Sequence, residues 1–229
     1  MYFDMKKFLL LLPLLTLSIT ACNLFGKKDN GSDSQEQSQS EEVIDTKTYG
    51  AGNQENEILT VGYDIPAGEY WIKPSGVDNY SRFDVYDARG YNPNNEYENY
   101  VFGFMCCADE HYLTVLKAGQ FLKLNYCVAQ NSKVDQGITT IKNGMFKVGE
   151  QIKPVEGMVR VKVCEKAPER IALRPNFVVY TYNEKMGDFE YDSLDSKTHG
   201  VFDSDDTQYH LIENPPVGSY IELVGLEVC

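Results

Sequence analysis

Few side chains in this 229-residue sequence are spaced as catalytic groups are. Its three histidines, His111, His199 and His210, are isolated, and the sequence contains no HExxH, GxSxG or phosphate-binding loop motif. General acid and base chemistry would depend on two of the 34 carboxylates, and no spacing singles out one pair. We predict no catalytic residue, and a secreted hydrolase that uses two carboxylates stays the alternative.

Aromatic side chains offer a different chemistry, because their rings stack on sugar and peptide groups. Trp71 is the only tryptophan, and Tyr91, Tyr97 and Tyr100 are interspersed with asparagines in one polar segment. We predict that these four residues are the ligand-binding candidates. The alternatives are a tryptophan tucked under a neighbouring loop, and a polar loop without a ligand, because NPNN at residues 92–95 is itself a turn signal.

An acidic stretch in the last forty residues could present oxygen ligands to Ca²⁺, which takes six to eight of them. Its segment DSDDTQ at residues 203–208 lacks the glycine and the terminal glutamate of an EF-hand loop. We therefore predict a solvated acidic loop, with no metal and no other cofactor. The stretch contains Asp192, Asp195, Asp203, Asp205 and Asp206.

Five cysteines follow Cys22, and an odd number leaves at least one thiol free or paired between chains. Cys164 and Cys229 each end a strand-like run, so they are the first pair to test for a disulfide. A second option joins Cys127 to Cys106 or Cys107. Small buried thiols without any disulfide explain the same residues.

The N-terminus has the order of a secretory signal: two lysines, an apolar run from Phe8 to Leu17, small residues and then Cys22. Residues 19–22, ITAC, resemble the lipobox of bacterial lipoproteins, which implies removal of residues 1–21 and a lipid on Cys22. We expect the chain on the extracellular face of a bacterial cell membrane. An ordinary secretory signal or a buried apolar helix are the alternatives.

Residues 22–57 are rich in Gln, Ser, Glu, Asp, Asn and Gly and contain few aromatic residues. Such a segment cannot bury enough apolar surface to offset the entropy lost on ordering. We predict a disordered linker between the lipid and the folded part.

From Ile58 onward, short β-rich runs are broken by Gly and Pro, with no sustained helical period. This pattern predicts an all-β fold built of two related β-sandwich-like modules, residues 58–130 and 144–229. The formal net charge of −13 excludes a nucleic-acid partner for these modules.

A recurring phrase supports the two modules: a turn ending in glycine, one polar residue and an aromatic residue. It occurs at residues 66–70, 117–121 and 216–220. The segment VGYDIPAGEYWI at residues 61–72 resembles the "DIPAG" repeat of uncharacterised surface lipoproteins of Gram-positive bacteria. The second module departs from it, with Gln151 in place of Asp64 and two extra residues before Gly157. The resemblance implies display on the cell envelope and carries no catalytic residue.

In the duplicated pattern, Gly68 aligns with Gly157 and Trp71 with Arg160. Because Arg160 belongs to a polar row, we expect Trp71 to face water or a ligand. Together these features predict a cell-surface lipoprotein that acts as a non-catalytic binding or display module. Its expected partners are the membrane, through the lipid, and an extracellular glycan, peptide or protein.

The lipobox generates a direct test. Cells that express the full chain should incorporate a palmitate analogue into it, and Cys22→Ala should abolish the label because no acceptor thiol remains at the cleavage site. Equal labelling of Cys22→Ala and the unchanged chain would place the anchor elsewhere.

Overall fold

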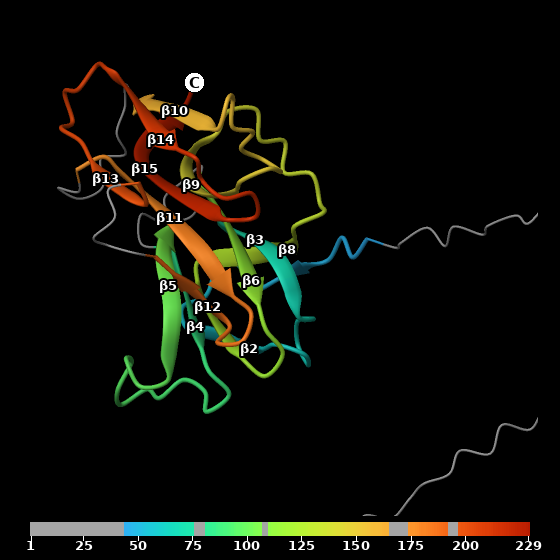
Figure 1. Cartoon of the computed structure of the whole chain (residues 1–229). Helices are drawn as coiled ribbons and strands as arrows, with labels where there is room; N and C mark the ends of the chain where they lie inside the picture. The colour runs from blue at the N-terminus through green and yellow to red at the C-terminus, as the bar shows by residue number, and fades with distance from the viewer. Residues whose placement is uncertain (1–43, 76–80, 107–109, 165–173, 192–196) are drawn as a thin grey trace, which may run out of the picture. The chain divides into compact units, whose positions relative to one another are not determined.

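The computed structural model describes residues 44–75, 81–106, 110–164, 174–191 and 197–229, all within one compact unit, Glu42–Cys229 (Figure 1). The predicted signal peptide and Cys22 lie outside these residues. Within them, no helix has the length and apolar character that crossing a membrane would require.

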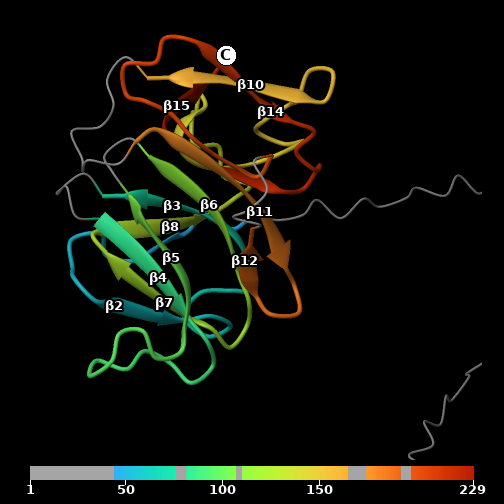
Figure 2. The same ribbon diagram turned by 60° about the vertical axis from the view of Figure 1, so that its left-hand side comes forward.

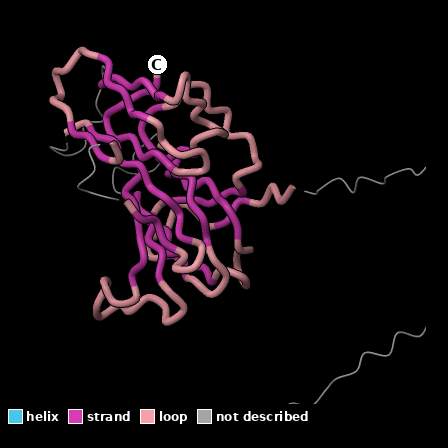
Figure 3. The backbone as a smooth tube through the Cα atoms, in the orientation of Figure 1, coloured by secondary structure: helices cyan, strands magenta, loops and turns pink. Residues whose placement is uncertain are grey.

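The described residues form strands joined by turns and loops, without a helix, which confirms the predicted all-β fold (Figure 3). Fifteen strands are present in the described ranges. Their bounds are β1 Thr48–Tyr49, β2 Glu57–Thr60, β3 Gly68–Pro74, β4 Ser81–Tyr86, β5 Tyr100–Cys106, β6 His111–Leu116, β7 Phe121–Asn125, β8 Cys127–Asn131, β9 Lys142–Lys147, β10 Met158–Val163, β11 Asn176–Asn183, β12 Asp188–Glu190, β13 His199–Val201, β14 Tyr209–Glu213 and β15 Tyr220–Val228.

These strands form two sheets that pack together as a sandwich (Figure 2). An eleven-stranded sheet has the order β1-β8-β3-β6-β9-β15-β10-β14, with β11 joined to β15, and β12 and β13 joined to β11. A four-stranded sheet has the order β2-β7-β4-β5. Aromatic rings join the sheets, because Phe83 of β4 and Phe104 of β5 lie 6.1 and 5.4 Å from the ring of Tyr112 in β6.

The strands of residues 44–131 and 142–229, here called the first half and the second half, pair in the same pattern. β3 pairs with β6 as β10 pairs with β14, and β2 pairs with β7 as β9 pairs with β15. β7 pairs with β4 and β4 with β5, just as β15 pairs with β11 and β11 with β13. Every pairing among strands β2 to β7 therefore has a counterpart in the second half.

The turns that follow β2 and β9 are also held by equivalent hydrogen bonds. The N–H of Thr60 donates to the Asp64 carboxylate at 2.8 Å, and the N–H of Lys147 donates to the Gln151 side-chain oxygen at 3.1 Å. The change from Asp64 to Gln151 therefore keeps an acceptor for the same backbone donor.

The two halves are joined where β6 pairs in parallel with β9, with His111 opposite Gly144 and Tyr112 opposite Met145. Gly144 has a φ of 123°, and a Cβ atom on it would overlap the carbonyl oxygen of His111. Only glycine permits this close approach of two backbones. The joint makes one sheet out of strands from both halves.

Trp71 is buried, with 3% of its surface exposed, so its predicted exposure to water or a ligand is wrong. β3 is central in its sheet and is covered on both faces. Tyr70 and Ile72 point to one buried face, and Trp71 packs against Phe146 of β9, with ring centroids 6.0 Å apart. The indole N–H donates to the carbonyl of Ser132 at 3.2 Å, which satisfies its one polar atom.

The predicted linker also ends earlier than residue 57. Thr48 and Tyr49 form β1, which pairs with Gln130 and Ala129 of β8, and Tyr49 is 6% exposed. Its ring meets Tyr70 at 6.0 Å, edge to face. Burial of Tyr49, pairing with β8 and hydrogen bonds such as that from Gln130 to Thr48 thus order a segment whose composition predicts disorder.

The burial of Trp71 gives a paired stability test. Trp71→Ala should lower the free energy of unfolding by about 3 to 5 kcal/mol, because it leaves a cavity at the joint between halves. Arg160→Ala at the equivalent, exposed position should change it by less than about 0.5 kcal/mol. Urea denaturation measures both, and equal effects would contradict the different packing of the two positions.

Candidate binding surface

Three candidate tyrosines, Tyr91 and Tyr97 of the β4–β5 loop and Tyr100 at the start of β5, do not form one platform. Tyr91 and Tyr100 are half-buried and pack edge-on against Tyr86, with centroids 5.2 and 6.0 Å away. One face of the Tyr91 ring is covered by the Lys123 ammonium at 4.2 Å. Tyr97 is 80% exposed and stands apart from this cluster. Two of the three rings thus support the loop, and one is free to meet a ligand.

Buried charges explain why this loop is held down. Lys123 on β7 and Asp84 on β4 are almost fully buried, and each has a partner of opposite charge. Lys123 lies 3.7 Å from Glu96 of the loop, and Arg82 lies 2.7 Å from Asp84. Burial raises the pKa of Asp84, and its hydrogen bond with Arg82 opposes that rise. Glu96 therefore ties the loop to one buried charge of the sheet, Lys123.

The predicted disulfide between Cys164 and Cys229 is not formed, and both thiols are free. The N–H of Cys164 donates to Gly225, whereas the N–H of Cys229 donates to Arg160. The two cysteines thus lie four residues apart along the β10–β15 ladder, or about 13 Å, beyond the reach of a disulfide. Burial raises the pKa of the Cys164 thiol to about 11, so it is neutral at physiological pH. The second option fails too, because Cys127 is a buried free thiol.

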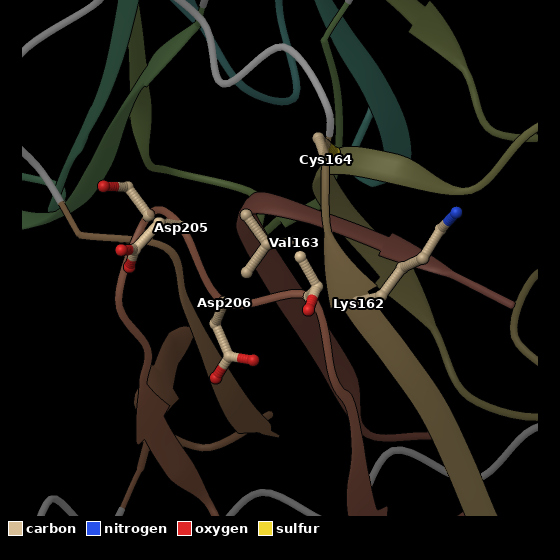
Figure 4. Close-up of a pocket in the computed structure, with 7 residues that line it drawn as sticks. Lys162, Val163, Cys164, Asp205 and Asp206 are labelled. Atoms are coloured by element: carbon tan, nitrogen blue, oxygen red, sulfur yellow. The ribbon is translucent and has the colours of Figure 1, made fainter.

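A pocket of about 250 Å³ lies beside the acidic loop, between the end of β10 and residues 204–207 (Figure 4). Its charged groups do not converge. Lys162 extends its amino group away from Asp205 and Asp206 and bonds Glu227 at 2.9 Å instead.

Asp206 is already used within the acidic loop, since its carboxylate lies 3.0 Å from His210 Nε2 and accepts the N–H of Gln208. His210 in turn stacks on Phe202 with centroids 4.0 Å apart. Asp192 and Asp195 lie outside the described residues. In the ranges that are described, no three His, Cys, Asp or Glu side chains gather as metal ligands would.

A larger hollow, of about 390 Å³, lies on the exposed face of β10 and β14, between the turn before β10 and the end of β15. Two of its aliphatic residues are well exposed, Val155 at 74% and Leu211 at 50%. Its lining consists of the aliphatic Val155, Met158, Leu211 and Val228, with Lys153, Glu156, Arg160 and Cys229. Val159 also borders it, but is 2% exposed. An apolar hollow edged by a few charges is the usual form of a ligand or partner site.

The first half shows why this hollow is open. Trp71 is opposite Leu113 in the β3–β6 pair, and Arg160 is opposite Leu211 in the β10–β14 pair. The sheet face with Trp71 and Leu113 is therefore equivalent to the face with Arg160 and Leu211. In the first half this face is covered by Phe146, and Leu113 is fully buried. In the second half Arg160 lies across the ring of Tyr209, at 4.5 Å, and leaves Leu211 accessible. Sequence reasoning missed this surface, although the replacement of Trp71 by Arg160 was its signal.

One carboxyl group of the larger sheet, Glu222, is half-buried near the buried Glu110. Glu222 of β15 stands between Met145 of β9 and Val178 of β11, both buried. Burial, together with the nearby charge of Glu110, raises the pKa of Glu222 to about 7. The Tyr180 hydroxyl donates to Glu222 at 2.9 Å and opposes the rise.

Comparison of the chain with protein-family models, curated proteins and solved structures gives no match. The surface is therefore interpreted from its own geometry.

The pKa of Glu222 makes the stability of the fold depend on pH. Because the folded-state pKa exceeds that of the unfolded chain, stability falls as pH rises from about 4.5 to 7 and above. Glu222→Gln should remove this loss, so its stability relative to wild type should increase by about 2 to 3 kcal/mol between pH 5 and 8.

Denaturation at a series of pH values measures this effect. Tyr180→Phe should shift the loss to higher pH, because the removed donor favours the ionised carboxylate. A constant difference between Glu222→Gln and wild type across the range would contradict the raised pKa of Glu222.

Proposed function

We propose that this protein is a cell-surface lipoprotein, anchored through Cys22, whose two halves are related copies that form a non-catalytic binding module. The observation that supports binding is the open hollow on β10 and β14. The equivalent face of the first half is buried. In the second half this face is open, and its apolar residues are available to a partner.

The chemistry of the hollow favours one class of partner. Its aliphatic walls suit the side chain of an extracellular peptide or protein, and its marginal charges suit the polar groups beside that side chain. A glycan is less suited, because sugar recognition needs exposed rings and amides, and Tyr97 alone is freely exposed among the candidate aromatic residues.

A carboxylate-dependent hydrolase is the weaker proposal. Glu222 and Glu110 lie near one another, but Glu110 is buried and Glu222 is half-buried and bonded by Tyr180. Glu69 and Glu150 are also neighbours, and both bind Lys147 Nζ, at 3.1 and 2.8 Å. Each pair is thus already engaged with neighbouring side chains.

A substitution of Val155 can test the binding surface without disturbing the core, because this side chain is exposed. A library of extended peptides, cell-wall fragments and glycans is screened against residues 44–229, which contain the whole described core. We expect peptides with an aliphatic or aromatic residue to be retained. Val155→Asp should weaken their binding about tenfold or more, because it places a charge in the apolar hollow.

Val217→Asp is the matched control, because Val217 is an exposed valine, 82% accessible, outside the hollow. It should leave peptide binding unchanged, and both variants should keep the melting transition of the wild type. Retention of glycans alone, equally by all three proteins, would overturn the proposed partner class.

A further inference from the structure

β14 is the last strand of the eleven-stranded sheet, and among the described strands it pairs only with β10. The direction of its backbone groups follows from the neighbouring ladder. The carbonyl of Arg160 is bonded by the N–H of Cys229, so Arg160 directs its backbone groups toward β15. Because neighbouring residues in an antiparallel ladder alternate in direction, Val159 and Val161 direct theirs toward β14.

Val159 and Val161 are paired with Ile212 and His210, respectively. The intervening residues of β14, Tyr209, Leu211 and Glu213, therefore direct their N–H and C=O groups toward the free edge. All three side chains are exposed, Tyr209 at 56% and Leu211 at 50%. An unpaired edge with exposed apolar side chains is a template for another strand.

The first half shows that this edge can be paired. β6, the counterpart of β14, is joined through its outer edge to β9. In a head-to-tail assembly, β14 of one copy would pair with β2 of the next, as β6 pairs with β9 within the chain. This pairing is blocked, because Glu57 of β2 occupies the position that Gly144 has in β9. A Cβ there would overlap the opposing carbonyl, as it would at Gly144. Head-to-tail growth of chains is thus blocked by one side chain.

We propose that β14 pairs with β14 of a second copy of this chain, antiparallel and about a two-fold axis at Leu211. This goes beyond the binding function, because it concerns the backbone edge of β14, although Leu211 also lines the hollow. In this register Leu211 meets Leu211 of the second copy, and Tyr209 meets Glu213. The outward backbone groups of these residues then face one another and exchange both hydrogen bonds in each pair.

The side chains complement this register. Arg160 lies over the Tyr209 ring at 4.5 Å, so Glu213 of the second copy would approach a guanidinium as well as the ring. A two-fold axis perpendicular to the sheet places both hollows on the same face. The dimer would therefore present two apolar hollows side by side to one partner.

The mass of residues 44–229 in solution tests the proposal without any ligand. We expect light scattering to give twice the monomer mass at high concentration in 0.15 M salt, where the Debye length of about 8 Å screens the net negative charge of the two bodies. A monomer at every concentration overturns the proposal. Loss of peptide binding alone would leave this measurement unchanged, so the two proposals fail separately.

Two substitutions test the register. Leu211→Lys places like charges on the two-fold axis and should raise the dimer Kd about tenfold or more, equivalent to about 1.4 kcal/mol. Val155→Lys adds the same charge on the same face away from the edge and should leave dimerisation unchanged. Equal effects of the two variants would show that the edge is not the interface.

Disulfide trapping provides an independent measurement. Across a hydrogen-bonded antiparallel pair the Cα atoms are about 5.5 Å apart, within disulfide range. Leu211→Cys, made with Cys229→Ser to remove the exposed thiol, should form a covalent dimer on mild oxidation. Val155→Cys in the same background should not. Equal rates for both would contradict pairing at Leu211.

Discussion

The parallel pairing of β6 with β9 is the contact on which the arrangement of this protein depends. It requires Gly144, because no other residue lets the backbone of β9 pass the His111 carbonyl so closely. Once the strands are joined, Phe146 of β9 covers Trp71, and both faces of β3 become interior. The pairing of β6 with β9 thus both buries Trp71 and makes the larger sheet continuous.

The joint also makes two similar halves different. The pairings among β2 to β7 recur in the second half, yet the face that carries Trp71 and Leu113 is buried, and the face that carries Arg160 and Leu211 is open. The residue types fit this difference, because the charged Arg160 is suited to an exposed position and the large aromatic Trp71 to a buried one. A hollow and a strand edge that no other described strand pairs with therefore occur together in the second half.

Local patterns in the sequence predict most of the fold. Short β-rich runs broken by Gly and Pro predict the all-β fold that the described residues adopt. Tyr126, which separates β7 from β8, has a φ of 52°. A backbone reversal at a tyrosine has no local sequence signal, unlike one at glycine.

The site is less predictable, because it depends on contacts between distant segments. The orientation of Trp71 is inferred from strand alternation, but its environment is set by Phe146, 75 residues later. The Cys164 and Cys229 pair looks plausible until the ladder register separates the two residues. Short strands such as β12 and β13 form only because β11 offers them an edge, so their own three residues carry little signal.

The central claim is that the same strand edge is closed in the first half and open in the second. Amide hydrogen exchange of residues 44–229 in dilute solution tests it directly. We predict strong protection along β6 and rapid exchange at Tyr209, Leu211 and Glu213 of β14. Protection of these three amides equal to that of β6, in a solution where the protein is monomeric, would contradict the account.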